Sequence, residues 1–199
     1  MSDMILWRRL DLPGHEFGRL TRRDDGWELS GTAVFSQDHQ PCKLEYLIVC
    51  ACDWKTRAAR VSGVVGNREI ALRVSVDGER RWYLDDVECP AVAGCMDIDL
   101  GFSPATNLLP IRRLSLAVGQ GAQVTAAWLS FPSLTLELLP QVYRRDGPHT
   151  YRYESDGGAF VRLLEVNDVG FVTNYPGLWV EEGRLRRTAR EPERRVDRR

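Results

Sequence analysis

The chain has 199 residues, of which 43% are hydrophobic and 28% are charged, and its formal net charge is -1. These values are typical of one globular domain, and no apolar run reaches the roughly 20 residues that a transmembrane helix needs. The N-terminal stretch MSDMILWRRLDLPG lacks the apolar core and cleavage site of a secretory signal, so we expect a cytoplasmic protein.

Charge is distributed unevenly along the chain. The last 19 residues, EEGRLRRTAREPERRVDRR, hold eight arginines and five acids. Because such a segment has almost nothing to bury, we predict a β domain at residues 1–182 and a disordered charged tail at residues 183–199. The body shows no basic patch with interleaved aromatic residues, which disfavours nucleic acid as a partner. Five cysteines without zinc-finger spacing indicate free thiols, and we predict no cofactor.

Apolar and polar residues alternate along most of the chain, which is the pattern of half-buried β-strands. In chain order the alternation covers residues 27–35, 70–76, 114–118, 124–128, 134–138 and 160–166. Turn sequences such as GN, DG and DGG separate these segments. Connections this short join antiparallel strands, because parallel strands need longer crossovers. The predicted fold class is therefore all-β: a single curved antiparallel sheet or half-barrel of two similar halves, with little helix.

The stretch GCMDIDLGFSPATNLLPIRRLSL, residues 94–116, concentrates polar residues that could carry function. On a strand, Asp97 and Asp99 point to one side while their apolar neighbours point to the other. Such a carboxylate pair can hold a divalent cation, but that use belongs to a doubly wound parallel fold, which this sequence does not predict. We therefore predict no metal, and expect the carboxylates either to face solvent or to accept hydrogen bonds from a neighbouring arginine.

Arg112 is the first candidate for that arginine. If residues 112–118 form a strand, Arg112 shares the apolar face with the leucines that follow it. An arginine on an inward face is costly unless a carboxylate or a ligand satisfies its donors. Two interpretations stay open: Arg112 pairs with one of the two aspartates, or it rims, with arginines such as Arg57, a mostly apolar cavity that binds a small molecule.

Catalytic motifs are absent from the sequence. His15, His39 and His149 lie in predicted turns, away from any nucleophile and carboxylate pattern. The segment GQG at residues 119–121 leads into another strand rather than a helix, which makes it a hairpin turn and not a phosphate-binding loop. We predict no catalytic residues.

The central stretch also carries a family resemblance. DID followed by SPATNLLPIRRL, within residues 97–114, resembles a bacterial family of unknown function labelled "putative glycolipid-binding". Shorter matches occur at Trp7, Glu16, DWKTR at 53–57, Trp82, QVY at 141–143, YRY at 151–153 and YPGL at 175–178. The resemblance implies an antiparallel β fold of two similar halves, similar to the half-barrels of the lipoprotein localisation factors, which carry acyl chains in an apolar concavity. It supplies no catalytic residues.

The main hypothesis is a non-enzymatic binding protein for an amphipathic lipid or glycolipid, with the acyl chain on an apolar concave face. The residues predicted to lie at the polar end of the ligand are Trp54, Arg57, Asp97, Asp99, Asn107, Arg112 and Tyr143. One alternative is an enzyme that acts on a related ligand, with Asp97 or Asp99 as general base. Another is a protein-interaction module that uses the curved sheet and the basic tail.

Overall fold

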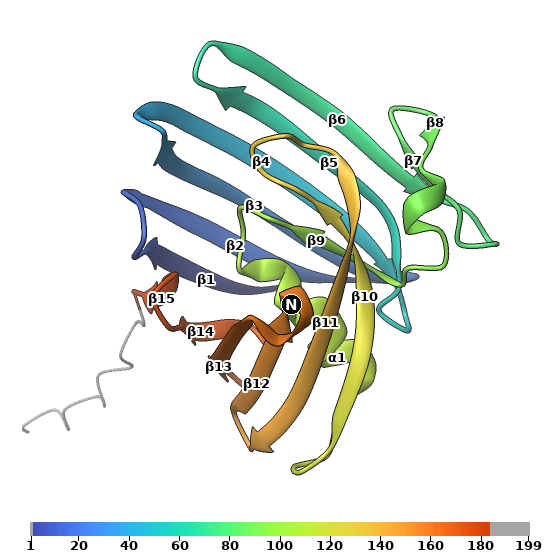
Figure 1. Ribbon diagram of the computed structural model, residues 1–199, viewed down its shortest axis with the longest axis vertical. Coiled ribbons are helices and arrows are strands. Elements are labelled where there is room, and N and C mark those ends of the chain that lie inside the picture. The colour runs from blue at the N-terminus through green and yellow to red at the C-terminus, as the bar shows by residue number, and fades with distance from the viewer. Residues whose placement is uncertain (1, 184–199) are drawn as a thin grey trace, which may run out of the picture.

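The protein is built on one large curved sheet of 15 strands, which does not close into a barrel (Figure 1). The structure is a computed structural model that describes residues 2–183. The predicted all-β class is confirmed. No helix among these residues is long and apolar enough to cross a membrane. All five cysteines have free thiols.

The first half of the sheet is a meander in which each strand pairs antiparallel with the next. Its strands are β1 (Ser2–Arg9), β2 (Gly14–Arg23), β3 (Gly26–Gln37), β4 (Gln40–Ala51), β5 (Thr56–Val65), β6 (Arg68–Val76), β7 (Trp82–Leu84) and β8 (Val87–Glu88), followed by the 3-10 helix η1 (Pro90–Val92). The predicted alternation is confirmed here: Leu29, Ala33 and Phe35 of β3 are buried, as are Ile70 and Val74 of β6.

The second half is a similar meander that begins at the opposite edge of the sheet. Its strands are β9 (Asp97–Leu100), β10 (Gly121–Leu129), β11 (Leu136–Gly147), β12 (Thr150–Ser155), β13 (Phe160–Val166), β14 (Val172–Tyr175) and β15 (Trp179–Glu182), with the 3-10 helix η3 (Asp156–Gly158) between β12 and β13. The last strand, β15, pairs antiparallel with β1. This ladder makes the two halves one continuous sheet.

The prediction fails at residues 114–118. Residue 114 ends the α-helix α1 (Leu108–Leu114), which follows the 3-10 helix η2 (Ala105–Asn107), and residues 115–118 form no strand. The connection from β9 to β10 is therefore long enough for a crossover, and these two strands pair in parallel, as the exception in a sheet expected to be wholly antiparallel. A helix of seven residues whose first four are all buried shows no 3.6-residue period that a sequence could reveal.

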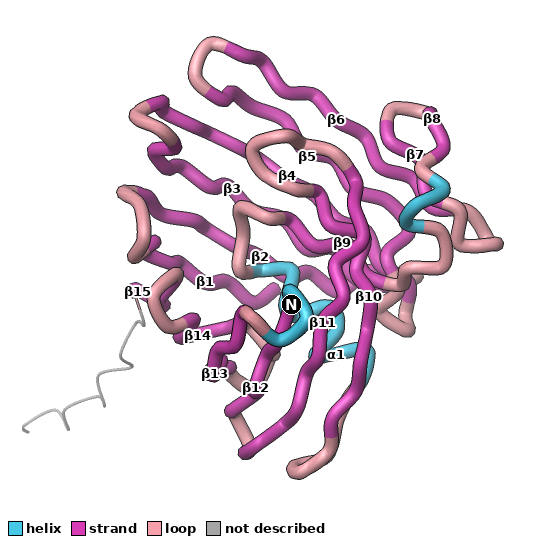
Figure 2. The backbone as a smooth tube through the Cα atoms, viewed as in Figure 1, coloured by secondary structure: helices cyan, strands magenta, loops and turns pink. Residues whose placement is uncertain are grey.

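Residues 97–114, comprising β9, η2 and α1, are called the central segment below. Its helices η2 and α1 lie between the two halves of the sheet, and β9 is the edge strand of the second half (Figures 1 and 2). Phe102, Leu108 and Leu109 of this segment are almost completely buried and belong to the same apolar core as the inward faces of β3 and β4. The apolar concave face that was predicted to hold an acyl chain is therefore covered by side chains of the central segment.

Candidate functional site

The two adjacent arginines of the central segment have different surroundings. Arg113 donates from Nε and Nη2 to the two carboxylate oxygens of Asp97, at 2.9 and 2.5 Å. The Asp97 side chain is 1% exposed and that of Arg113 17% exposed. The predicted pairing of an aspartate with Arg112 is therefore wrong. The two arginines lie on a helix, where successive side chains point about 100° apart, so the strand register that favoured Arg112 does not apply.

Asp99 has no arginine partner among residues 2–183. One of its carboxylate oxygens accepts a hydrogen bond from Gln141 Nε2 at 2.8 Å, and the same amide nitrogen contacts the Tyr153 hydroxyl at 3.1 Å. Burial raises the pKa of Asp99 to about 6, against the opposing hydrogen bond from Gln141. On the other side of β9, Ile98 and Leu100 lie in the apolar core. The predicted division of β9 into a polar and an apolar side is confirmed.

Asn107 and Tyr143 contact each other in the interior. The Tyr143 hydroxyl donates to Asn107 Oδ1 at 2.9 Å, while Asn107 Nδ2 donates to the carbonyl oxygen of Pro104 at 3.1 Å. Tyr143 is fully buried and Asn107 is 5% exposed. The hydrogen bond between these two predicted ligand residues holds the central segment against β11.

Glu16 on β2 anchors the central segment to the first half of the sheet. Its Oε1 accepts hydrogen bonds from the Tyr46 hydroxyl at 2.7 Å and from Ser103 Oγ at 2.5 Å, while Oε2 is buried without a partner. Burial raises the pKa of Glu16 to about 8, and the hydrogen bonds and the charge of Arg9 only partly oppose this. Glu16 therefore carries a proton at neutral pH.

Trp54 and Arg112 lie in a column in which two stacked indole rings stand between two guanidinium groups. The rings of Trp27 and Trp54 are stacked, with centroids 4.3 Å apart and planes at 17°. The guanidinium carbon of Arg112 lies 5.1 Å from the Trp54 ring centroid, and that of Arg22 lies 4.6 Å from Trp27 on the other ring. The first half of the sheet thus holds Arg112 through an indole face rather than through a carboxylate.

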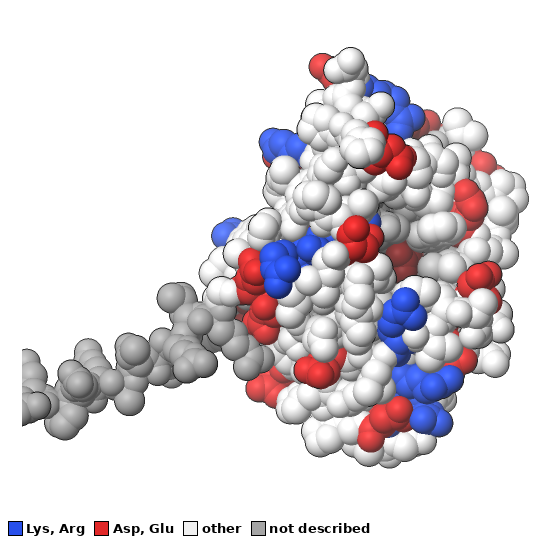
Figure 3. Space-filling view, turned by 60° about the vertical axis from the view of Figure 1, so that its left-hand side comes forward, with Lys and Arg blue, Asp and Glu red and all other residues white. Residues whose placement is uncertain are grey.

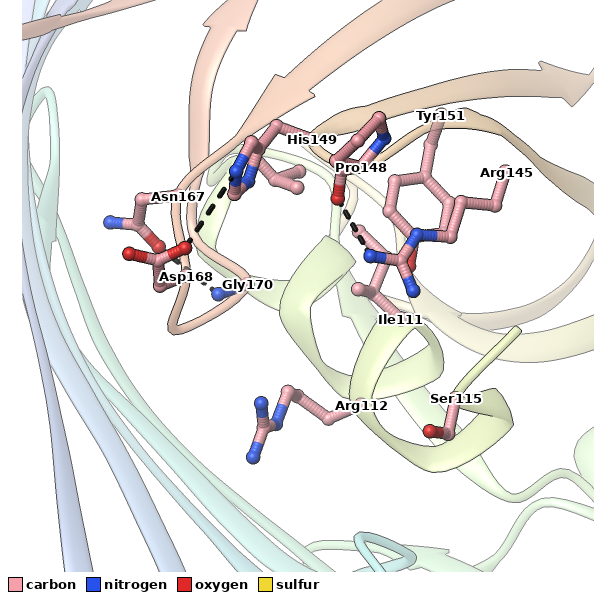
Figure 4. A pocket seen from close by; sticks show the side chains of 11 residues that line it. Ile111, Arg112, Ser115, Arg145, Pro148, His149, Tyr151, Asn167, Asp168 and Gly170 are labelled. Atoms are coloured by element: carbon pink, nitrogen blue, oxygen red, sulfur yellow. Dashed lines mark hydrogen bonds and ion pairs between the residues drawn. The ribbon is translucent and has the colours of Figure 1, made fainter. Parts of the chain in front are cut away.

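A cavity of about 250 Å³ adjoins Arg112, between α1, the β11–β12 turn and the β13–β14 turn (Figure 4). Figure 4 shows Arg112 extending from one side of the helix and Arg145 on the other side, beside Tyr151. Arg145 donates to the carbonyl oxygens of Leu116 and Pro148, at 2.9 and 2.7 Å. Arg112 has no hydrogen bond or ion pair with any residue that the structure describes.

Arg57 lies in an exposed ion pair and does not join these groups. Its Nη1 is 3.1 Å from a carboxylate oxygen of Asp25, and the two side chains are 49% and 76% exposed. The structure thus separates the predicted residues into three buried contacts, one stacked pair next to a cavity, and one surface arginine.

Residues 4–181 match the model of a family described as "Putative glycolipid-binding". The chain belongs to this family. A DUF1089 family protein from Pseudomonas aeruginosa, known from its crystal structure, is similar in sequence and fold: it is 34% identical, and the two match with a TM-score of 0.73 over 82% of this chain and 90% of that one. The comparison with curated proteins found no match. Membership of this family supports a role in binding.

Several residues of this family member were missed as site residues. Gln141 and Tyr153 lie in the QVY and YRY matches, and Glu16 was also among the matching positions, but none of them was assigned a contact. Glu16 carried one further signal, since it shares the inward face of β2 with Leu20. An acid at an apolar position of a strand indicates either an internal partner or a proton.

Proposed function

We propose that the protein binds an amphipathic lipid or glycolipid without transforming it, and that the polar head of this ligand lies in the cavity beside Arg112. The observation that carries the proposal is a guanidinium group held on Trp54 at the edge of a cavity, without an ion-pair partner among residues 2–183, in a member of a glycolipid-binding family. A small cavity with a few polar groups suits recognition of a head group.

With the central segment in this position, the protein is suited to bind the head group of the ligand rather than its acyl chain. Phe102, Leu108 and Leu109 fill the apolar concave face, so an acyl chain reaches that face only when the central segment moves. Contacts that oppose this movement include the hydrogen bonds of Ser103 to Glu16, of Tyr143 to Asn107 and of Gln141 to Asp99.

Mass spectrometry of lipids extracted from the natively purified protein tests this function. We expect one lipid class to copurify, and Arg112→Ala to reduce its amount about tenfold or more, because the substitution removes charge-assisted hydrogen bonds. Arg73→Ala is the matched control, since Arg73 lies on β6 in an exposed pair with Asp86. Wild-type protein that carries no lipid from any preparation would contradict the proposal.

A specific observation keeps an enzymatic alternative for Asp99. Asp97 is excluded as a general base because both of its oxygens accept hydrogen bonds from Arg113, whereas Asp99 has no cationic partner and a pKa of about 6. If Asp99 is a base, Asp99→Asn should abolish turnover of a radiolabelled copurified lipid and leave its binding intact. Lipid recovered unchanged after incubation with wild-type protein would remove this alternative. The third hypothesis, a protein-interaction module, depends on the basic tail, which falls outside the described residues.

A further inference from the structure

The cavity beside α1 contains more positive than negative charge. Its lining includes two cationic side chains, Arg112 and Arg145, and one anionic side chain, Asp168. Asp168 is 96% exposed and lies 3.7 Å from His149 Nε2, so solvent screens most of its charge. Neither arginine has a carboxylate within ion-pair distance among the residues that the structure describes.

The two arginines differ in how many donors they leave available. Arg145 uses its guanidinium to hold the turn, through backbone carbonyls on either side of the cavity. Arg112 makes no such bonds, and its five N–H groups have no partner in residues 2–183. Arg145 therefore contributes a fixed positive charge to the cavity. Arg112 contributes a positive charge and also N–H groups that can donate to a ligand.

Arg112 is held in position without the use of those donors. The Trp54 ring supports the guanidinium, and Trp54 is in turn stacked on Trp27. On the opposite side the stem of Arg112 passes Gly170, where an added Cβ would lie only 3.2 Å from Arg112 Cδ. A guanidinium placed over an aromatic ring keeps its N–H groups available for a carboxylate or phosphate acceptor.

We propose that the Arg112 end of this cavity binds an anionic group, a carboxylate or a phosphate, and that the head of the bound amphiphile is therefore anionic. The second clause rests on the proposed function; the first does not. A volume of about 250 Å³ suits this assignment, because pockets that enclose drug-sized ligands run from roughly 300 to 1,000 Å³. The space accommodates a small charged group and not a whole lipid.

Isothermal titration calorimetry with three probes separates the two clauses. The probes are inorganic phosphate at constant ionic strength, decyl phosphate, and decyl maltoside, the last two below their micelle-forming concentrations. The variants are Arg112→Ala, Arg112→Lys and, as the control, Arg73→Ala. We expect phosphate and decyl phosphate each to bind the Arg73→Ala control as tightly as the wild-type protein. Arg112→Ala should weaken the binding of both probes about tenfold or more. Arg112→Lys should restore part of this loss, because it keeps the charge without the planar fork.

Asp168→Asn supplies a test in the opposite direction. Removing this negative charge should strengthen phosphate binding at low ionic strength, and added salt should erase the gain. Phosphate bound outside this cavity would show neither effect. Circular dichroism and unfolding midpoints of each variant exclude loss of the fold as the cause.

Each pattern of results decides between the two proposals. Equal binding of both detergents, unaffected by Arg112→Ala, would overturn the anion site and leave amphiphile binding standing. Binding of phosphate alone would support the anion site and contradict the lipid function. Binding of none of the three probes would overturn both.

Discussion

Replacing Arg113 with leucine is expected to lower the free energy of unfolding by about 3–5 kcal/mol, because it leaves the Asp97 carboxylate buried without its partner. Asp97 is 1% exposed and depends on Arg113 for the bonds to both oxygens. The neighbouring Arg112→Leu should cost less than about 1 kcal/mol, since Arg112 is exposed and forms no ion pair with residues 2–183. Adjacent substitutions on one helix turn thus have very different expected effects.

Urea denaturation followed by tryptophan fluorescence measures both changes. The double variant Asp97→Asn with Arg113→Leu should recover part of the lost stability, because a neutral amide costs less to bury than an unpaired carboxylate. If the two arginine variants were equally stable, the ion pair would not be the cause. If the double variant were less stable than the sum of its single changes, the charge argument would be wrong.

A second large effect is expected from Glu16 when the pH is changed. Its pKa is raised from 4.5 to about 8 in the folded protein, chiefly by burial. Between these values the folded state binds one more proton than the unfolded state, so stability falls as the pH rises, by up to about 1.4 kcal/mol per pH unit. The loss is complete once the pH passes the folded-state value, and below the unfolded-state value this group contributes no slope.

Glu16→Gln is expected to remove this dependence and to be more stable than wild-type protein at pH 9. The range from pH 6 to 8 is the informative one, because Asp99, whose pKa is also raised by burial, only reaches about 6. Unfolding free energies measured at several pH values provide the test. Glu45→Gln, at a side chain that is 51% exposed beside Lys43, is the control and should keep the wild-type slope. A wild-type curve that is flat from pH 6 to 8 would contradict the assignment of a buried proton to Glu16.

The strands could be predicted because their signal is local. Leu29, Ala33 and Phe35 follow a two-residue period that the pleat alone imposes. The parallel ladder between β9 and β10 could not be predicted in this way. It depends on the position that β9 takes after the chain crosses from the β8 edge of the sheet to the opposite edge. The helix α1 could not be predicted either, because its apolar run LLPI is equally typical of a buried strand.

The ion pair of the central segment was predicted in kind, but its cationic partner was not. An aspartate of the DID motif does pair with an arginine, but with Arg113 rather than Arg112. One residue along the chain decides between an internal ion pair and a free guanidinium, and only the helical path of the chain settles it. The column of Trp27, Trp54 and Arg112 was equally beyond the sequence, because it joins the start of β3 and the β4–β5 turn to the last turn of α1.

The ladder between β1 and β15 sets a condition on biosynthesis. β1 is made first, yet one of its two neighbours is the last strand of the sheet. Until β15 leaves the ribosome, β1 presents an open row of backbone donors and acceptors that another chain could pair with. Met4 and Leu6, which stay exposed even in the finished sheet, lie on that strand. The exposure of β1 as an open edge is therefore confined to one interval of synthesis, and it ends when β15 pairs with β1.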